Sequence, residues 1–95
     1  MGGYTYIIAN RKNGALYTGV TAEMSRRALD HREGAGSKFA AKYGIYRLAY
    51  VEFHDEIGNA ILREKRIKKW RRAWKIALIE ESNPDWRDLF FELNC

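Results

Sequence analysis

A glutamate interrupts the apolar stripe of the longest helix that the sequence predicts. Glu64 lies three residues after Ile61 and three before Ile67, so it projects to the same side as both. Burying a carboxylate costs free energy unless a cation or a metal ion is bound to it. Three interpretations are open: an ion pair with Lys68, a metal-binding or catalytic role, or a place at the solvated edge of the stripe. The apolar members that we expect to face a sheet are Ile57, Ala60, Ile61, Ile67 and Trp74.

An arginine and a histidine share one face of an earlier predicted helix. Arg27 and His31 are four residues apart, and they align with Met24 and Ala28 by the i, i+3, i+4, i+7 rule. An arginine on the inward side of a helix needs an anion, either a carboxylate or a phosphate. A lone histidine is more often a structural residue than a ligand, so both interpretations of His31 are open.

Three tyrosines fall on the first two predicted strands. Tyr4 and Tyr6 alternate with Thr5, so their hydroxyls lie on one face of the strand. Tyr17 is on the partner strand, near Tyr6 if the chain turns between them. From the residues alone, cross-strand aromatic packing is the simplest explanation of these tyrosines.

The elements that must position these side chains follow from propensity and periodicity. Strands are predicted over residues 4–9, 15–20 and 46–53. A helix is predicted over residues 23–33, and a short one ends at residue 42. A long helical pattern runs over 55–71 and continues over 73–81, and a final short helix is predicted over 85–91. Asn13-Gly14 predicts a hairpin turn, and Thr21 and Ser37 are predicted helix N-caps. The order is β-β-α-α-β-α-α, an α+β fold with helices packed on a three-stranded sheet.

Composition narrows the class of protein. The 95 residues predict a single domain over 1–95, and no apolar stretch approaches the ~20 residues of a membrane span. We therefore expect no membrane partner. The single cysteine, Cys95, allows no internal disulfide and no cysteine-based zinc site. We find no signal peptide and expect a cytoplasmic protein.

Positive charge is concentrated in one segment. Residues 55–75 hold eight basic and three acidic residues, whereas residues 76–95 hold one arginine and five acids. A basic segment is typical of proteins that bind polyanions, including nucleic acid. The alternative is a solvated helix face, which composition alone favours.

Taken together, the motifs resemble the GIY-YIG nuclease superfamily over nearly the whole chain. The first motif corresponds to Tyr-Thr-Tyr at residues 4–6, and the second to Tyr-Thr-Gly at residues 17–19. Further matches are Arg27 with His31, Gly-Ser-Lys at residues 36–38, the acidic helix motif at 63–69, and the segment 83–89, which is similar to the small standalone branch. Tyr4 replaces the glycine of the first motif. The literal Gly-Ile-Tyr at residues 44–46 follows the second motif, so we interpret it as the entry to the third strand.

The resemblance implies a sheet of antiparallel strands and a metal-dependent nuclease that acts on DNA. It implies one divalent metal ion, Mg²⁺ or Mn²⁺, held by Glu64, because a single carboxylate suits an ion that keeps several waters. Arg27 would contact the scissile phosphate. Tyr6 would be the general base, with Tyr17 assisting or orienting the water. A tyrosine with a pKa near 10 is a poor base at pH 7, so Arg27 and the metal must favour its phenolate form.

Other residues are carried over from the same resemblance. His31 would help to position the water or Tyr6, and Lys38 would neutralise phosphate. Gly19 and Asn83 are expected supporting residues. The residues expected to bind the nucleic acid are Lys38, Lys68, Lys69, Arg71 and Arg72.

Two other functions are open at this stage. A nucleic-acid-binding module with the same fold and little catalysis is one, since Tyr4 departs from the motif and no attached domain is available to select a target. A scaffold that docks a basic partner on the acidic C-terminal segment is the other. For a nuclease, we expect selectivity for the structure of the substrate rather than for its base sequence.

Overall fold

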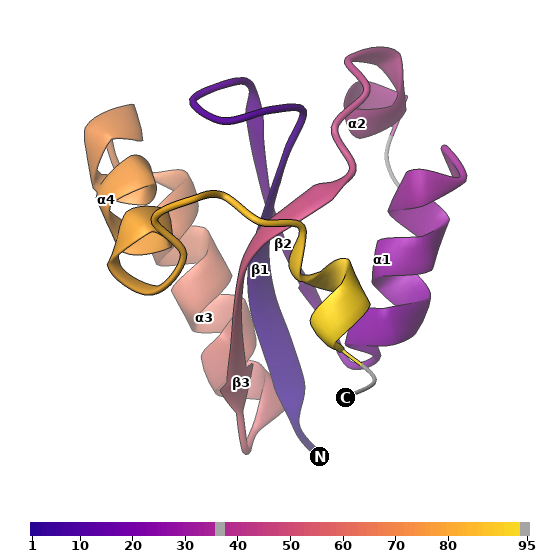
Figure 1. Ribbon diagram of the computed structural model, residues 1–95. Coiled ribbons are helices and arrows are strands. Elements are labelled where there is room, and N and C mark those ends of the chain that lie inside the picture. The colour runs from indigo at the N-terminus through magenta and orange to yellow at the C-terminus, as the bar shows by residue number, and fades with distance from the viewer. Residues whose placement is uncertain (36–37, 94–95) are drawn as a thin grey trace.

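The chain folds around a three-stranded antiparallel sheet, drawn at the centre of Figure 1. The computed structural model describes residues 1–35 and 38–93. The strands are β1 (Gly3–Ala9), β2 (Leu16–Thr21) and β3 (Arg47–His54), and β1 lies between the other two. Tyr6 on β1 is directly opposite Gly19 on β2. The predicted fold class and the predicted antiparallel sheet are confirmed.

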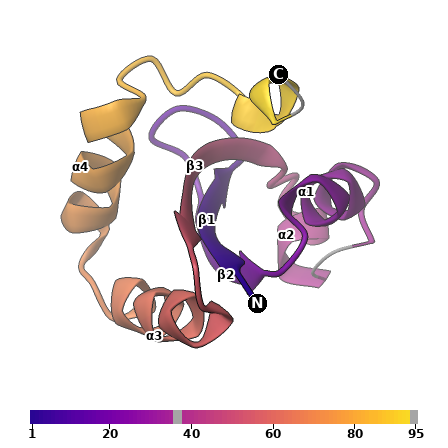
Figure 2. The same ribbon diagram turned by 90° about the horizontal axis from the view of Figure 1, so that it is seen from below.

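Helices cover both faces of the sheet. They are α1 (Met24–Arg32), α2 (Lys38–Lys42), α3 (Ile57–Lys68) and α4 (Arg72–Ser82), followed by a short 3-10 helix, η1 (Leu89–Glu92). Figures 1 and 2 show α3 and α4 on one face, with α1, α2 and η1 on the other. The predicted N-cap Ser37, between α1 and α2, lies outside the described residues.

The central strand contributes to a separate core on each face of the sheet. Tyr6 and Ile8 of β1 pack with Met24 and Ala28 of α1, while Ile7 and Ala9 point to the opposite side. This alternation is the two-residue period of a strand, here buried on both faces. The second core includes Ala49, Ile67, Ile79 and Trp86. The sheet is therefore held rigidly between two layers, which fixes the position of Tyr6.

The predicted apolar stripe of the long helix is partly wrong. Ala60 and Ile67 are fully buried as expected, but Ile61 is 37% exposed and Trp74 is 50% exposed. The prediction extended the helical periodicity past the residue at which α3 ends. α3 ends at Lys68, and α4 begins a new axis at Arg72, so Trp74 does not share a face with Ile67.

Two further expectations about helix ends are wrong. Residues 85–88 are not helical, because Trp86 has φ +56°, which a right-handed helix does not accept, and its indole is fully buried. Asp88 then caps η1 by accepting a hydrogen bond from the backbone N–H of Phe90. At α1, the N-cap is Glu23, and the Thr21 hydroxyl instead accepts the Glu23 N–H at 3.1 Å.

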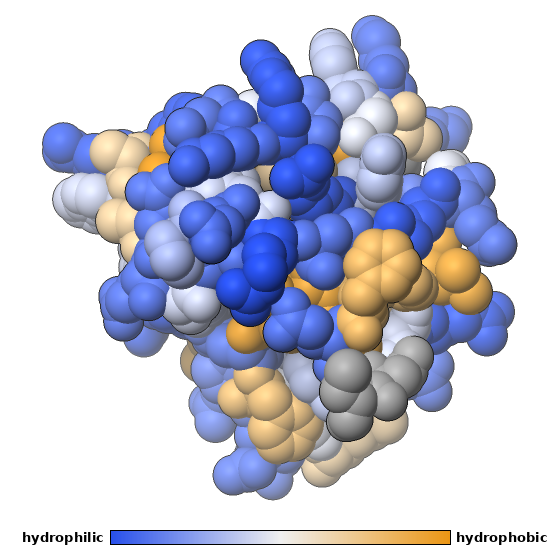
Figure 3. Space-filling view, viewed as in Figure 1, coloured by the Kyte–Doolittle hydropathy of each residue, from blue (hydrophilic) through white to orange (hydrophobic). Residues whose placement is uncertain are grey.

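The C-terminal segment is attached to both β3 and α1. The side chain of Arg32 is ion-paired with Asp88, and its guanidinium lies 4.2 Å from the centroid of the Phe90 ring. In the view of Figure 3 the surface is largely hydrophilic, with an apolar patch over η1. Phe91, which belongs to η1, is 72% exposed. None of the helices in the described part of the chain has the length and apolar character needed to cross a bilayer.

Candidate active site

The site begins with the close approach of Tyr6 to Gly19. The two residues are cross-strand partners, so any side chain at position 19 would project on the same face as the tyrosine. A Cβ at position 19 would lie 2.5 Å from Cζ of Tyr6, closer than real contacts allow. The tyrosine ring therefore lies across the backbone of β2, and only glycine leaves room for it. This gives the predicted supporting residue Gly19 a steric reason.

The Tyr6 hydroxyl bonds with two side chains from α1. Nε2 of His31 lies 2.9 Å from the hydroxyl oxygen, and Nε of Arg27 donates to the same oxygen at 3.4 Å. Both residues project from the face of α1 that Met24 and Ala28 fix against the sheet. The predicted alignment of Arg27 with His31 is thus present, and it converges on the first-motif tyrosine.

Burial favours the uncharged forms of Tyr6 and His31. It raises the pKa of Tyr6 above 10.0, and the hydrogen bond from Arg27 offsets only part of this increase. The pKa of His31 is lowered to about 4, first by burial and then by the positive charge of Arg27. The ring is therefore neutral at pH 7. In the tautomer that carries its proton on Nδ1, Nε2 accepts the proton of the Tyr6 hydroxyl.

Tyr17 connects this group to the long helix α3. Its ring packs edge-on against His31, with centroids 5.7 Å apart. Nζ of Lys68 lies 5.9 Å from the centroid of the Tyr17 ring and pairs with Glu64 at 3.1 Å. The negative charge of Glu64 also raises the pKa of Tyr6, so the carboxylate acts electrostatically at the tyrosine. Residues from β1, β2, α1 and α3 therefore form one continuous group.

Glu64 is mostly buried and paired, as one of the three interpretations predicted. Its side chain is 13% exposed, and the i, i+4 ion pair with Lys68 is present. In residues 1–35 and 38–93, no three histidine, cysteine or acidic side chains gather into a complete metal site. A single carboxylate nevertheless fits Mg²⁺ or Mn²⁺, because Mg²⁺ keeps several waters and takes further oxygen ligands from substrate phosphate.

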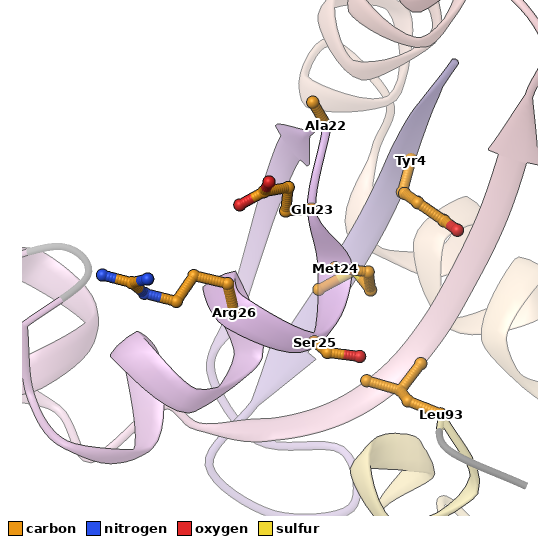
Figure 4. A pocket seen from close by; sticks show the side chains of 7 residues that line it. All are labelled: Tyr4, Ala22, Glu23, Met24, Ser25, Arg26 and Leu93. Atoms are coloured by element: carbon orange, nitrogen blue, oxygen red, sulfur yellow. The ribbon is translucent and has the colours of Figure 1, made fainter. Parts of the chain in front are cut away.

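Arg27 borders a hollow at the junction of β2 and α1. This hollow has a volume of about 230 Å³, and its polar lining residues include Thr21, Arg26, Arg27 and Asp30. A neighbouring hollow of about 400 Å³, drawn in Figure 4, extends past Arg26 and Tyr4 to Leu93. Arg26 lines both hollows, so a groove runs along the start of α1 and reaches Arg27.

The predicted nucleic-acid-binding residues differ in their surroundings. Lys38, Lys68, Lys69 and Arg71 are exposed. Arg72 donates instead to the backbone carbonyls of Asn13 and Gly14 in the turn between β1 and β2. Its guanidinium holds α4 against the hairpin, which is a structural contact.

Asn83 is fully buried and acts within the fold. Its Nδ2 donates to the carbonyls of Ala49 and Arg87 at 3.1 and 2.9 Å, and its Oδ1 accepts the N–H of Arg87 at 3.0 Å. These bonds attach the segment after α4 to β3, so the support that Asn83 provides is structural.

A second polar cluster lies on the opposite side of the sheet and was not predicted. Glu52 accepts hydrogen bonds from Tyr50, Arg63 and His54. Burial and then the bond to Glu52 raise the pKa of Tyr50 to about 12. The i, i+2 spacing of Tyr50, Glu52 and His54 on one strand was the available signal. Each of these side chains has a hydrogen-bond partner within the cluster. The bond from Arg63 to Glu52 connects α3 to β3.

The fold and the site define a class of protein: a small α+β domain in which strand tyrosines, a helix arginine and a helix glutamate face one another. Residues 2–77 match the model of the GIY-YIG catalytic domain. The chain belongs to the GIY-YIG family, a nuclease superfamily whose domain implies nucleic-acid binding.

Similar proteins are UPF0213 proteins, which are small single-domain members of this family. One from Staphylococcus saprophyticus is 36% identical over 82% of this chain and 94% of its own length. Another, from Clostridium perfringens, is 36% identical over 96% of this chain and 97% of its own length. The solution NMR structure of a UPF0213 protein from Bacillus halodurans has a TM-score of 0.58 and 28% identity, covering 93% of each chain.

Proposed function

We propose that this protein is a divalent-metal-dependent nuclease that hydrolyses phosphodiester bonds in DNA, cutting as an endonuclease. The observation that carries the proposal is the position of the Tyr6 hydroxyl, which bonds with both Arg27 and His31. A buried phenol with an acceptor on one side and a cation on the other is suited to proton transfer next to an anion. The negative charge of Glu64 is one of the causes that raise the pKa of Tyr6, and this electrostatic effect supports a metal site near the tyrosine.

Tyr6 acts as the general base in this proposal. Its hydroxyl oxygen takes a proton from the attacking water while its own proton passes to Nε2 of His31, 2.9 Å away. This transfer avoids a free phenolate, which burial disfavours at neutral pH, and the imidazolium that it forms on His31 is transient because burial lowers the pKa of that ring to about 4. The water oxygen forms a bond to phosphorus as the bond to the leaving oxygen breaks. Tyr17 packs against His31 and keeps its ring in place.

Arg27 binds the phosphate group. Its Nε is bonded to Tyr6, and it also lines the 230 Å³ hollow, which a phosphate oxygen can enter from the groove. Planar guanidinium groups bind phosphate through paired hydrogen bonds and stabilise the added negative charge of the transition state. Lys38 and Lys69 are exposed and available to neutralise neighbouring phosphates.

Glu64 is the residue that would hold the metal ion. A bound Mg²⁺ or Mn²⁺ would supply charge stabilisation for the phosphate oxygens. Lys68 pairs with this carboxylate at 3.1 Å in a largely buried position. The same lysine, beside Tyr17, is also placed to contact a strand of nucleic acid.

The proposal is tested by incubating labelled single-stranded, double-stranded and branched DNA, and matched RNA, with the protein in Mg²⁺, in Mn²⁺ and in chelator. The expected result is metal-dependent cutting that favours particular DNA structures over particular sequences. Binding to every substrate with no cutting in either metal would contradict it, and would favour a nucleic-acid-binding module of the same fold.

A further inference from the structure

A hollow outside the site described above lies between two tryptophans. The indoles of Trp70 and Trp74 meet edge to face, with centroids 6.2 Å apart at 81°. With Ala77, Leu78 and Glu81 they line an open surface hollow of about 280 Å³. Binding sites for drug-sized ligands begin at about 300 Å³, so this one suits a single planar ring system. Trp74 is 50% exposed, so part of its indole surface is accessible to a ligand.

Arginines flank both indoles without filling the hollow. The guanidinium of Arg63 lies 5.1 Å from the centroid of the Trp70 ring, and that of Arg71 lies 4.8 Å from the centroid of the Trp74 ring. Each guanidinium lies over its indole ring, and neither arginine is among the residues that line the hollow. They would attract an anionic chain while leaving the indoles open to stacking.

The chain segment that contains Trp70 and Trp74 carries a strong positive charge. Residues 63–75 hold eight basic residues and one acid, Glu64, which is already paired with Lys68. This charge is complementary to a phosphate backbone. An apolar peptide partner would gain nothing from it. Aromatic rings interleaved with cations are typical of surfaces that bind single strands by base stacking.

The tryptophans follow closely in sequence the residues of α3 that belong to the proposed active site. Lys68 contacts the Tyr17 ring and Glu64, and Trp70 follows two residues later. Lys68 and Lys69 are both exposed, so their charges would bind phosphates of a strand whose base occupies the hollow. Glu81 at the rim offers an acceptor for the exocyclic amino group of a base.

We propose that the hollow between Trp70 and Trp74 binds an unpaired base of the nucleic-acid strand. The inference rests on the proposed function for its substrate and deepens it, because a paired base stays stacked in its duplex and cannot enter. The tryptophans would thus select single-stranded or flapped substrates. They act in binding and are not catalytic residues.

The test measures binding in chelator, where no cutting occurs, so it is independent of whether the protein is a nuclease. Fluorescence anisotropy of a labelled single-stranded DNA and of a blunt duplex of equal length is compared for wild type, Trp74→Ala and Trp74→Phe. The control is Phe53→Ala, which removes an aromatic that is 57% exposed on β3. Thermal unfolding of each variant reports whether its fold is intact.

The expected result is a loss of single-strand affinity on the order of 5- to 100-fold in Trp74→Ala, with duplex affinity within about two-fold. Trp74→Phe retains most of the affinity because it keeps a stacking face, and Phe53→Ala is unaffected. A single-stranded RNA of the same sequence shows which nucleic acid the hollow prefers, and an equal loss with RNA also supports base stacking. Equal losses on single strand and duplex, or no loss at all, would overturn the proposal. A wild type that binds in this way yet cuts nothing in Mg²⁺ or Mn²⁺ would refute the nuclease and leave this inference standing.

Discussion

The ring of Tyr6 lies across the backbone of Gly19, its partner on the neighbouring strand. A Cβ at position 19 would be 2.5 Å from Cζ of the tyrosine. The close approach of the ring to β2 fixes the position of the Tyr6 hydroxyl, which forms hydrogen bonds with both Arg27 and His31. The second motif of the family thus supplies a tyrosine and also the space that the first-motif tyrosine needs.

Gly19→Ala should displace the Tyr6 ring. Overpacking of a rigid core costs about 1–3 kcal/mol, and the hydroxyl would lose its alignment with Arg27 and His31. We expect a lower free energy of unfolding in urea and a cleavage rate reduced by more than ten-fold. Thr18→Ala, next along β2, is the control and should reduce cleavage far less. An unchanged rate in Gly19→Ala would mean that the position of Tyr6 does not matter.

Tyr6→Phe should keep the fold and remove the proton relay. The ring stays in its core, while the hydroxyl that bonds His31 and Arg27 is lost. General base catalysis contributes about 10²–10⁴ in rate, so we expect a loss of that size in single-turnover cleavage. Tyr50→Phe removes a hydroxyl from the cluster on the opposite side of the sheet and should cut normally. Comparable activity in the two variants would remove Tyr6 from the role of base.

Arg27→Ala and Arg26→Ala form a matched pair. Both arginines line the 230 Å³ hollow, but only Arg27 bonds the Tyr6 hydroxyl, whereas Arg26 is exposed and pairs with Asp30 at 3.7 Å. Loss of a phosphate-stabilising group costs about 10²–10³ in rate, which we expect only for Arg27. Cleavage kinetics at saturating DNA would check this. Equal small effects would show that phosphate is bound elsewhere.

The stability of the protein should fall as the pH drops from about 6.5 to about 4. His31 has an ordinary pKa of 6.5 when the chain is unfolded, and burial lowers it to about 4 in the fold. In that interval the unfolded chain binds a proton that the folded chain does not, so acid favours unfolding. The full difference is on the order of 3 kcal/mol, and below pH 4 the loss from this group stops growing.

His31→Gln provides the control for this pH dependence. Glutamine does not titrate, so urea unfolding of the variant between pH 4 and 7 should show a shallower slope than wild type. If the two slopes are equal, His31 is not the group that titrates.

Local periodicity was enough to predict one side of the candidate site. The i, i+4 spacing placed Arg27 and His31 together, and the Asn13-Gly14 turn predicted that Tyr17 would approach the first strand. These inferences succeed because each depends on one helix or one hairpin. The contact between the α1 residues and Tyr6 follows only when the helix packs on the sheet, and a long-range contact of that kind is not encoded in any single window of sequence.

Periodicity failed where the chain changes direction. Trp74 was assigned to the buried stripe because the pattern continues past Lys68, yet α4 starts on a new axis. Trp86 adopts a positive φ that its residue type disfavours, because burial of its indole compensates for the strain. The contact of Arg72 with the hairpin carbonyls joins residues 58 and 59 apart in sequence, which periodicity does not predict; its binding of nucleic acid stays a prediction.

The most direct test of the nuclease is cleavage by Glu64→Gln. Single-turnover cutting of labelled DNA in Mg²⁺ and Mn²⁺ is compared for wild type, Glu64→Gln and Glu33→Gln, which changes an exposed carboxylate at the end of α1. Glutamine keeps the shape and removes the charge that would hold the metal. The account predicts metal-dependent cutting by wild type and Glu33→Gln, and none by Glu64→Gln with an unchanged thermal unfolding midpoint. Undiminished cutting by Glu64→Gln would contradict the metal assignment.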